Sequence, residues 1–341
     1  MSIDNKSELG NTEKISAIIV NWNGKHWLTR CIESLLSQKF TSLEIIVVDN
    51  DSSDGSIEFL ESNFPLVNLV RSDHNRGFAG GNNLGIDASS GAWILLVNND
   101  AWLEENAISE LLKVANREHA DVVGAVEVRY NDSSPYHSGK NIIDVLGHPL
   151  PADDVGFNNY FFLSGVCLLI KKDLYIDSGG FDNDFFMYFE EIDWFWRLHL
   201  LGKKTALAKT AVVHHAGHGS SGGLYKLDYH RFLWRNQNCL TMLIKNYAFY
   251  NLLWIIPLYL LLNFTEIMIF VLMGHLGIAK SYFLGWLFNI QNLNKTLKKR
   301  RYIQKIRIKS DKEIMRSMYR GSAKLAHLKL WLKNSKIKNV L

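Results

Sequence analysis

The strongest constraint on the fold is the alternation of short aliphatic runs with amphipathic segments. The runs that we predict as strands are Ile15–Val20, Glu44–Val48, Val67–Val70, Trp93–Val97, Val122–Val128, Phe162–Ile170 and Thr205–Val213. Helical patterns lie between the first of these strands, for example at His26–Ser37 and Glu104–Arg117. Strands that are separated by helices form βαβ units, so the expected fold class is α/β with a mostly parallel sheet. Ligands of such sheets bind beyond the carboxyl ends of the strands.

The N-terminal residues and the cysteines indicate the cellular compartment in which the protein folds. Residues Met1–Lys14 are polar and lack an apolar stretch, which predicts a disordered tail at 1–14 and no secretory signal. The three cysteines, Cys31, Cys167 and Cys239, are scattered and form no paired spacing. This pattern indicates a reducing compartment with no disulfide framework.

One segment of the α/β part shows little periodicity. Residues Asn131–Asn159 contain polar clusters and two prolines near their end, Pro149 and Pro151. We predict a long loop, which is either a functional lid or a plain surface excursion.

The last third of the chain differs in composition and forms a predicted helical region at 224–341. Leu252–Met273 is a long apolar run interrupted by Pro257 and Glu266, and Tyr282–Ile290 is a shorter one. A spanning helix needs about 20 apolar residues with few charges, so the first run is borderline. We expect membrane association, at the surface or partly inserted, and the alternative is a helical hairpin buried in a soluble protein.

A basic segment follows these apolar runs. From Lys280 onward the chain has 17 Lys and Arg against 2 acidic residues, and five of the basic residues stand between Lys295 and Arg301. Basic and aromatic residues beside apolar helices suit a bilayer interface. The basic run lacks any known DNA- or RNA-binding motif, so we expect no nucleic-acid partner.

Polar residues follow the first two predicted strands. The first strand ends in Val20 and is followed by Asn21 and Asn23, and after the second strand stand Asp49, Asn50 and Ser52. An Asp at a strand end can bind a ribose or a base N–H. The simpler alternative is that the neighbouring Ser53 or Asp54 caps the helix that begins near Gly55.

A glycine-rich turn lies before the fourth strand. Its residues include Asn75, Gly77, Gly80, Gly81 and Asn82. Glycines permit close approach of the backbone and place N–H groups at a helix start, where anions bind. The spacing matches neither a P-loop nor a dinucleotide fingerprint.

The fourth strand ends in Asn98, Asn99 and Asp100. Mg²⁺ and Mn²⁺ favour one or two carboxylates together with phosphate oxygens of a substrate, and Asp100 is the anionic ligand here. A turn residue without a metal is the alternative. His214 and His215 close the last predicted strand, and one of them could complete a metal site.

An acidic segment begins the most apolar predicted helix. Glu190, Glu191 and Asp193 lie within four residues, and Arg197 follows Asp193 at i+4. Acidic residues favour a helix N-terminus, and the i, i+4 pair is expected to be an ion pair. Glu191 lies about 100° round the helix from Glu190 and is available for another role. A carboxylate among aromatic residues can have a raised pKa, as a general base needs.

These clusters, in this order, resemble the family 2 glycosyltransferases with the GT-A fold, most closely a bacterial rhamnosyltransferase-like branch. The resemblance covers about 15–223, and the segment Tyr229–Tyr247, with Arg235, Asn236, Lys245 and Asn246, is also similar. It implies a GT-A domain at 15–223, followed by the helical, membrane-associated region.

The resemblance also implies roles for the residues. The nucleotide-sugar would be held by Val20, Asn21, Asn23, Asp49, Asn50, Ser52, Asn75, Gly77, Gly80, Gly81, Asn82, Asn98 and Asn99. Asp100 matches the metal ligand of the family's DxD motif, and His214 matches a metal-binding histidine, with His215 as the alternative. Glu191 stands where the family's Glu-Asp-x-Asp motif has its basic Asp, so the candidate catalytic residues are Glu191, Glu190 and Asp193.

The implied reaction is a single inverting transfer from a dTDP- or UDP-sugar with Mg²⁺ or Mn²⁺, L-rhamnose being the favoured sugar. The acceptor is expected to be a lipid-linked glycan or oligosaccharide of the cell surface, such as lipopolysaccharide, reached from the cytoplasmic face of the inner membrane. No Gln-x-x-Arg-Trp motif of processive synthases is present. The alternatives are a UDP-hexose transferase, a nucleotidyltransferase and a non-catalytic membrane-bound sugar-nucleotide or glycan-binding relative.

Overall fold

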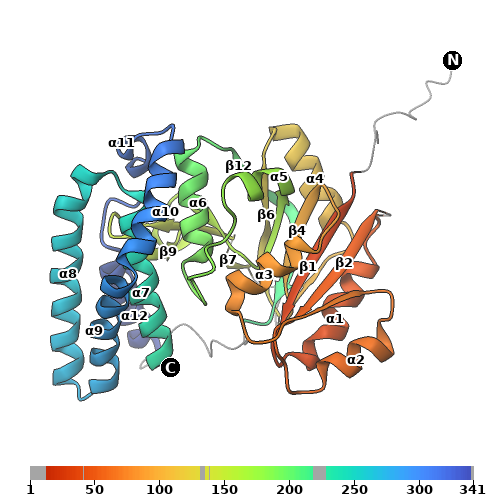
Figure 1. Ribbon diagram of the computed structural model, residues 1–341, viewed down its shortest axis with the longest axis horizontal. Coiled ribbons are helices and arrows are strands. Elements are labelled where there is room, and N and C mark those ends of the chain that lie inside the picture. The colour runs from red at the N-terminus through yellow and green to blue at the C-terminus, as the bar shows by residue number, and fades with distance from the viewer. Residues whose placement is uncertain (1–12, 41, 131–134, 138, 218–227, 339–341) are drawn as a thin grey trace.

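The computed structural model describes residues 13–40, 42–130, 135–137, 139–217 and 228–338. The predicted tail at 1–14 lies almost wholly outside these residues, and so does the predicted boundary between 223 and 224. A nine-stranded sheet forms the centre of the N-terminal part, and helices cover both of its faces (Figure 1).

The strands of this sheet follow the order β3-β2-β1-β4-β11-β6-β12-β5, and β7 pairs with β6. Strand β11 runs antiparallel to both of its neighbours, so β1, β2, β3, β4, β6 and β12 all point the same way. The prediction of a mostly parallel sheet is therefore confirmed. The strands are β1 (Ile15–Asn21), β2 (Leu43–Asp49), β3 (Asn68–Arg71), β4 (Trp93–Asn98), β5 (Ala101–Leu103), β6 (Val122–Arg129), β7 (Pro135–His137), β11 (Cys167–Lys171) and β12 (Thr205–His215).

Successive residues of each central strand point to opposite faces and enter two hydrophobic cores. Ile18 packs in one core with α3, α5 and α6, whereas Ile19 packs in the other core with α1, α2 and α4. Both faces are thus covered, which explains why the strands are apolar throughout. These helices are α1 (Lys25–Leu36), α2 (Ser56–Asn63), α3 (Gly77–Asp87), α4 (Ala107–Glu118), α5 (Lys172–Asp177) and α6 (Glu190–Leu200).

Two sequence predictions need correction. The run Phe162–Ile170 forms two strands, β10 (Phe162–Leu163) and β11, because a turn around Gly165 separates them. The segment predicted as one long loop, Asn131–Asn159, contains β7, β8 (Lys140–Ile143), β9 (Pro149–Pro151) and η1 (Asp153–Val155) in its described part. Strands β10, β8 and β9 form a small second sheet whose apolar side packs against α12 (Ala323–Lys338). These strands are too short to show a period-2 pattern in the sequence.

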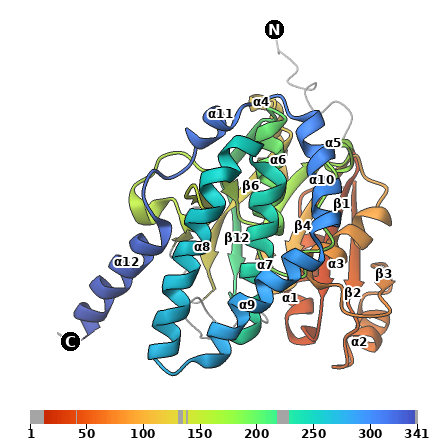
Figure 2. The same ribbon diagram turned by 60° about the vertical axis from the view of Figure 1, so that its left-hand side comes forward.

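The C-terminal part is helical, as predicted, and packs beside α6 (Figures 1 and 2). Its helices are α7 (Tyr229–Asn246), α8 (Phe249–Leu272), α9 (Leu276–Gln291), α10 (Leu293–Ile306), α11 (Asp311–Met315) and α12. Helix α8 continues through Pro257 and lies on the side of the molecule farthest from α1 and α2 (Figure 1).

Helix α8 buries only a narrow stripe. Its buried residues recur every fourth position, at Asn251, Ile255, Tyr259, Asn263 and Ile267. Most of its other large apolar side chains are exposed. Among the described residues, α8 is the one helix long and apolar enough to cross a membrane, with a mean hydropathy of 2.1 and 22% of that stretch buried.

Candidate active site

The carboxyl ends of the parallel strands meet along one edge of the sheet. Asn21 ends β1, Asp49 ends β2, Asn98 ends β4 and His215 ends β12. Strands β2, β1 and β4 are neighbours, and β12 pairs with β5, which directly follows β4 in the chain. Four of the segments predicted to carry chemistry therefore lie on this edge.

The segments after β1, β2 and β4 are joined by hydrogen bonds between side chains and backbone. The Asn21 amide donates to the Ser52 hydroxyl at 3.2 Å and accepts a hydrogen bond from the Asn99 amide at 2.9 Å. The Asp49 carboxylate accepts from the Ser52 N–H at 3.2 Å, and the Asn23 N–H donates to the Ser52 hydroxyl at 3.0 Å. Burial raises the pKa of Asp49. Ser52 therefore joins the turns after β1 and β2 of the predicted nucleotide site, and Asn21 joins them to the turn after β4.

Asn50 fixes the glycine-rich turn against the end of β2. Its amide nitrogen donates to the Asn75 side chain at 3.0 Å and to the Gly77 carbonyl at 3.1 Å. Its amide oxygen accepts from the Arg76 N–H at 2.9 Å. The predicted grouping of this turn with the strand ends is thus present in the structure.

The first amides of α3 have partners within the protein. The Gly77 N–H donates to the Asn75 side chain at 2.9 Å, and the Phe78 N–H donates to the Phe186 carbonyl at 2.8 Å. The expectation that these N–H groups would be available to an anion is wrong for these two. Gly77 has a φ of +68°, and a Cβ there would lie 1.9 Å from the Phe186 oxygen, so glycine is needed for this close approach.

The other residues of this turn pack the helix onto the sheet. A Cβ at Gly81 would lie 2.6 Å from a methyl group of Val20, and one at Gly80 would lie 2.7 Å from Arg76 Cβ. The buried Asn82 side chain donates to a backbone carbonyl one turn earlier, at 2.9 Å. In the described structure Gly81 lets α3 pack closely on β1, and Gly80 and Asn82 make contacts within α3, so their part in nucleotide binding stays a prediction.

His215, and not His214, lies next to Asp100. The His215 Nε2 atom is 3.2 Å from Asp100 Oδ1, and its Nδ1 atom is 2.6 Å from Glu127 Oε1. His214 points to the other face of β12 and lies 3.3 Å from Glu104. Successive strand residues face opposite sides, so only one of the two histidines can reach this site. The preference for His214 is therefore corrected to His215, the alternative.

Asp100 and His215 fit a divalent cation. Asp100 is buried, with 3% of its surface exposed, and the pair offers one oxygen and one nitrogen ligand. Burial lowers the pKa of His215, but its hydrogen bonds to Asp100 and Glu127 outweigh this and raise the pKa to about 10. Within the described part of the chain no group of three His, Cys, Asp or Glu side chains is placed to hold a metal by itself. The remaining ligands would come from a diphosphate and water.

Glu127 is a site residue that the sequence reasoning missed. It lies buried in β6, contacts His215, and accepts a hydrogen bond from the Ser164 hydroxyl at 3.0 Å. Its signal was an acidic residue inside an otherwise apolar strand. It holds the His215 ring toward Asp100, as carboxylates often do for ligand histidines.

Glu190 and Glu191 form a buried carboxylate pair at the start of α6. Burial, followed by the charge of Glu191, raises the pKa of Glu190 well above its ordinary value. Burial also raises the pKa of Glu191, although a hydrogen bond from Glu190 opposes this. Each of the two carboxyl groups thus holds its proton to a higher pH than an exposed glutamate does. The Oε2 atom of each is buried and has no hydrogen-bond partner among the described residues.

Glu191 lies beside the segment that joins β10 to β11. A Cβ on Gly165 would be 3.9 Å from Glu191 Oε1 and 3.5 Å from the Phe78 ring. The next residue, Val166, accepts a hydrogen bond from the Asn98 N–H at 3.1 Å. The start of α6, the start of α3 and the end of β4 therefore meet at this point.

The turn before Glu190 is held in a rare backbone conformation. Tyr188 and Phe189 have φ values of +70° and +73°, and residues other than glycine rarely adopt such values. The amide of Asn238, on α7, donates to the carbonyls of Met187 at 3.0 Å and Tyr188 at 2.8 Å. Such strain persists where the surroundings impose it, often at functional sites. Helix α7 thus sets the position of the carboxylate pair.

Asp193 has a structural role in this structure. It is fully buried and accepts hydrogen bonds from Arg197 at 3.1 Å, from Lys245 at 2.9 Å and from Asn246 at 2.9 Å. The predicted i, i+4 pair with Arg197 is present. With both oxygens engaged, Asp193 is not placed to contact a substrate, which corrects its inclusion among the candidate catalytic residues.

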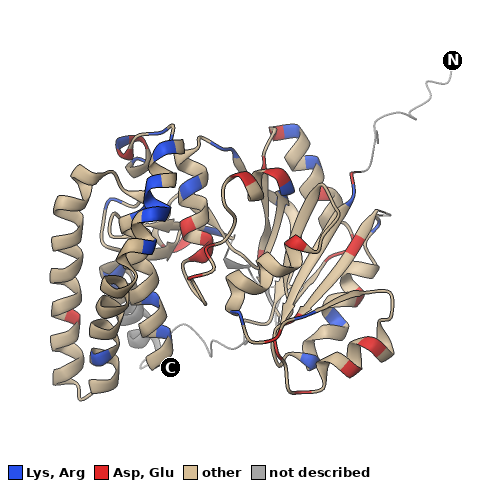
Figure 3. Ribbon diagram, viewed as in Figure 1, with Lys and Arg blue, Asp and Glu red and all other residues tan. Residues whose placement is uncertain are grey.

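Part of the basic run after the apolar helices faces the protein. Lys299 of α10 forms ion pairs with Asp182 and Asp184, and Lys295 pairs with Asp184. Figure 3 shows the basic side of α10 beside the acidic segment that leads into α6. The expectation that this run serves a bilayer interface therefore applies only to its exposed members, such as Lys298 and Arg301.

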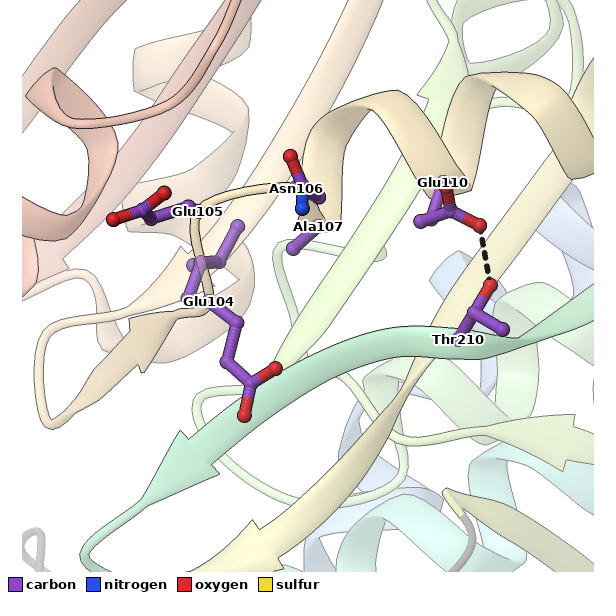
Figure 4. A pocket seen from close by; sticks show the side chains of 7 residues that line it. Glu104, Glu105, Asn106, Ala107, Glu110 and Thr210 are labelled. Atoms are coloured by element: carbon purple, nitrogen blue, oxygen red, sulfur yellow. Dashed lines mark hydrogen bonds between the residues drawn. The ribbon is translucent and has the colours of Figure 1, made fainter.

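A shallow hollow lies near His214, on the other side of β12 (Figure 4). Glu104, Glu105 and Glu110 line it, and Glu110 accepts a hydrogen bond from the Thr210 hydroxyl at 2.5 Å. The carboxylate pair and the turns joined by Ser52 do not line it, so the hollow is separate from the candidate site.

Comparison with known proteins agrees with this geometry. Residues 16–179 match the sequence model of the family described as glycosyl transferase family 2. The glycosyltransferase GlyG of Streptococcus pneumoniae is 30% identical over 212 residues, which cover 57% of this chain and 67% of that protein. The N-acetylglucosaminyl-diphospho-decaprenol L-rhamnosyltransferase of Mycobacterium tuberculosis is 26% identical over 241 residues, 61% of this chain and 78% of its own.

The fold is also similar to that of solved structures. The crystal structure of GalNAc-T7 with UDP, GalNAc and Mn²⁺ superposes with a TM-score of 0.56 at 14% identity, and it covers 71% of this chain. The chain spans about half of that structure's length, 49%. With a GT-A-like sheet and these relatives, the chain is a glycosyltransferase of family 2 that uses a nucleotide-sugar donor.

Proposed function

We propose that this glycosyltransferase adds one sugar per event, with inversion, to a membrane-associated and lipid-linked acceptor. The observation that carries the proposal is the Glu190–Glu191 pair. Glu191 has a buried oxygen without a partner among the described residues, lies beside the end of β4, and has a pKa that burial raises. A carboxylate with a raised pKa in such a place is suited to act as a general base.

In the proposed reaction Glu191 accepts the proton of an acceptor hydroxyl. The acceptor oxygen forms a bond to the anomeric carbon while the bond from that carbon to the diphosphate oxygen breaks on the opposite side. The nucleoside diphosphate leaves, and the anomeric centre is inverted. Burial and then the charge of Glu191 raise the pKa of the neighbouring Glu190, so Glu191 is the proposed proton acceptor of the two.

Asp100 and His215 would hold a divalent cation, Mg²⁺ or Mn²⁺. A cation there would supply charge that stabilises the departing diphosphate. Asp100 and His215 lie at the ends of β4 and β12. This position suits a diphosphate that is bound beyond the turns joined by Ser52. The crystal structure of GalNAc-T7 includes Mn²⁺, and it supports this assignment only because its fold is similar to that of this chain.

The favoured donor is a dTDP-sugar carrying L-rhamnose, and the second candidate is a UDP-hexose. The support for rhamnose is the similarity to the mycobacterial L-rhamnosyltransferase, at 26% identity. The name of that relative includes a diphospho-decaprenol, which also supports a lipid-linked acceptor. We place the enzyme in assembly of a cell-surface polysaccharide at the cytoplasmic face of the inner membrane.

The exposed apolar surface of α8 and α9 supports membrane association. Large exposed apolar side chains follow one another along both helices, for example Leu253, Leu261, Ile269, Phe283 and Ile290. Patches of this kind mark interaction sites. In α8 the one charged residue is Glu266, whose charge is paired with Lys324. Figure 3 shows α8 otherwise free of charged residues.

A thermal-shift panel on the detergent-purified protein tests the donor site. UDP, dTDP, GDP, CMP and ADP would each be added with and without Mn²⁺, since selective binding raises the melting temperature. We expect a shift with dTDP or UDP that needs the metal and is lost in Asp100→Ala. No shift with any nucleotide would contradict the proposal.

Turnover of two matched variants tests the base. Glu191→Gln should lower the rate of transfer about 10²- to 10⁴-fold, because the proton acceptor is lost. Glu190→Gln keeps the proposed base, Glu191, and should retain much more activity. Equal activity of Glu191→Gln and the wild type would refute the assignment of the base, and nucleotide binding by Glu191→Gln serves as the folding control.

A further inference from the structure

Arg235, in the second turn of α7, is a half-buried cation without a partner. It forms no hydrogen bond or ion pair with any residue that the structure describes. Burial, followed by the charge of Arg231, lowers the pKa of Arg235. A desolvated charge that lacks a partner costs free energy, so its presence needs an explanation other than stability.

Arg235 lies between the active-site turn and the apolar helices. Two tyrosines lie near Arg235: Tyr188, two residues before Glu190, and Tyr282 of α9. One turn earlier on α7, Arg231 donates a hydrogen bond to the Tyr188 hydroxyl at 3.3 Å. On the other side, Tyr282 packs against the aromatic rings of α7 and α8.

Charged groups from two other elements lie on the far side of Tyr282. The Glu266 carboxylate of α8 accepts a hydrogen bond from the Tyr282 hydroxyl at 3.2 Å. Lys324 forms an ion pair with Glu266 and compensates its charge. On α7, Arg231 and Arg235 stand one helical turn apart. Arginine binds phosphate oxygens through several N–H groups at once, which makes phosphate the matching ligand.

We propose that Arg235, together with Arg231, binds the phosphate group of a lipid-linked acceptor. This rests on the proposed function, and it adds the site that selects the acceptor. In such an acceptor the phosphate stands between the sugar and the lipid. Arg235 stands between the turn that carries Glu191 and the apolar helices α8 and α9. A phosphate held there would direct the sugar hydroxyl toward Glu191 and the lipid chain along α9.

Binding of farnesyl diphosphate tests the proposal without turnover. The titration would use the full-length protein in detergent, with UDP and Mn²⁺ at saturation so that the donor site is filled. We expect Arg235→Gln to weaken binding on the order of 10-fold or more, as loss of a charge-assisted hydrogen bond does. Arg301→Gln, on the exposed side of α10, is the matched control and should bind as the wild type does.

Further probes separate the sources of phosphate. Farnesol and inorganic pyrophosphate should each bind more weakly than farnesyl diphosphate, because each lacks one half of the acceptor. Equal binding of pyrophosphate and farnesyl diphosphate would overturn the lipid-linked assignment. Loss of UDP binding in Arg235→Gln would also overturn it, since Arg235 would then serve the donor.

Stability separates a binding role from a structural one. Since Arg235 has no partner to lose, Arg235→Gln should keep or raise the melting temperature in the absence of ligand. A lower melting temperature in Arg235→Gln that Arg235→Lys restores would identify a structural cation and overturn the proposal. If the wild type binds no nucleotide, the proposed function fails, but the same farnesyl diphosphate titration without UDP still tests Arg235.

Discussion

Replacing Gly77 by alanine tests the contact between the glycine-rich turn and the turn before α6. The new Cβ would lie 1.9 Å from the Phe186 carbonyl oxygen and 2.7 Å from its carbonyl carbon. Contacts below 3.0 Å are essentially never seen, so the two backbones must separate by about 1 Å. Overpacking of this kind costs about 1–3 kcal/mol, and a φ of +68° adds about 1–2 kcal/mol for alanine.

The expected loss in the free energy of unfolding is therefore about 2–5 kcal/mol. Activity should fall as well, because the same displacement moves the turn that positions Glu190 and Glu191. A misplacement of about 1 Å in a catalytic geometry can cost about 100-fold in rate. Urea denaturation measures the first quantity, and the rate of transfer at saturating substrates measures the second.

Gly156→Ala is the matched control. Gly156 has a φ of +64°, and a Cβ there would meet no atom within 4 Å. It shares the conformational cost of Gly77→Ala without the close contact, so it should lose only about 1–2 kcal/mol and keep its activity. If the two variants are equal in stability and in rate, the reasoning about the contact with Phe186 is refuted.

Three further predictions concern charged groups. His215→Ala should abolish the metal-dependent thermal shift with the nucleotide, whereas His214→Ala should leave it intact; the reverse order would return the ligand role to His214. Lys245→Met should lower the free energy of unfolding in urea by about 3–5 kcal/mol, because it leaves the buried carboxylates of Asp182 and Asp193 without their shared cation. Burial raises the pKa of Asp182, but Lys245 and a second lysine outweigh this and hold it below its ordinary value. Ionised Asp182 therefore stabilises the fold above the unfolded-state pKa of about 4, and this contribution is lost as the pH falls further. The stability gap between the wild type and Asp182→Asn should shrink below about pH 4, and a gap that stays constant to pH 2 would contradict the ion pair.

Several features of the site could be read from the sequence because they are local. An apolar strand followed by polar residues marks a carboxyl end, and parallel strands bring such ends to one edge. Asn21, Asp49 and Asp100 were located in this way. The acidic start of α6, with Glu190 and Glu191, was equally visible as carboxylates that begin an apolar helix.

Other features depend on which side of an element faces the site. His214 and His215 are adjacent on β12, so the sequence shows that they point in opposite directions but not which one faces Asp100. The register shift in β12 between Ala208 and Val212 makes this choice dependent on the folded sheet. Glu127 is visible in the sequence as an acidic residue in an apolar strand, but its contact with His215 depends on the pairing of β6 with β12.

The sequence by itself determined the class of fold, the family and the order of the chemical segments along the chain. These follow from the hydrophobic period and from residue types at strand and helix ends, which are properties of neighbouring residues. The tertiary structure decided which carboxylates are engaged by other side chains. Asp193 is engaged by α7, whereas Glu191 keeps a buried oxygen without a partner among the described residues, because long-range packing distributes partners that no local pattern specifies. Within the same part of the chain, this packing leaves Arg235 without a partner between the turn before α6 and the apolar helices.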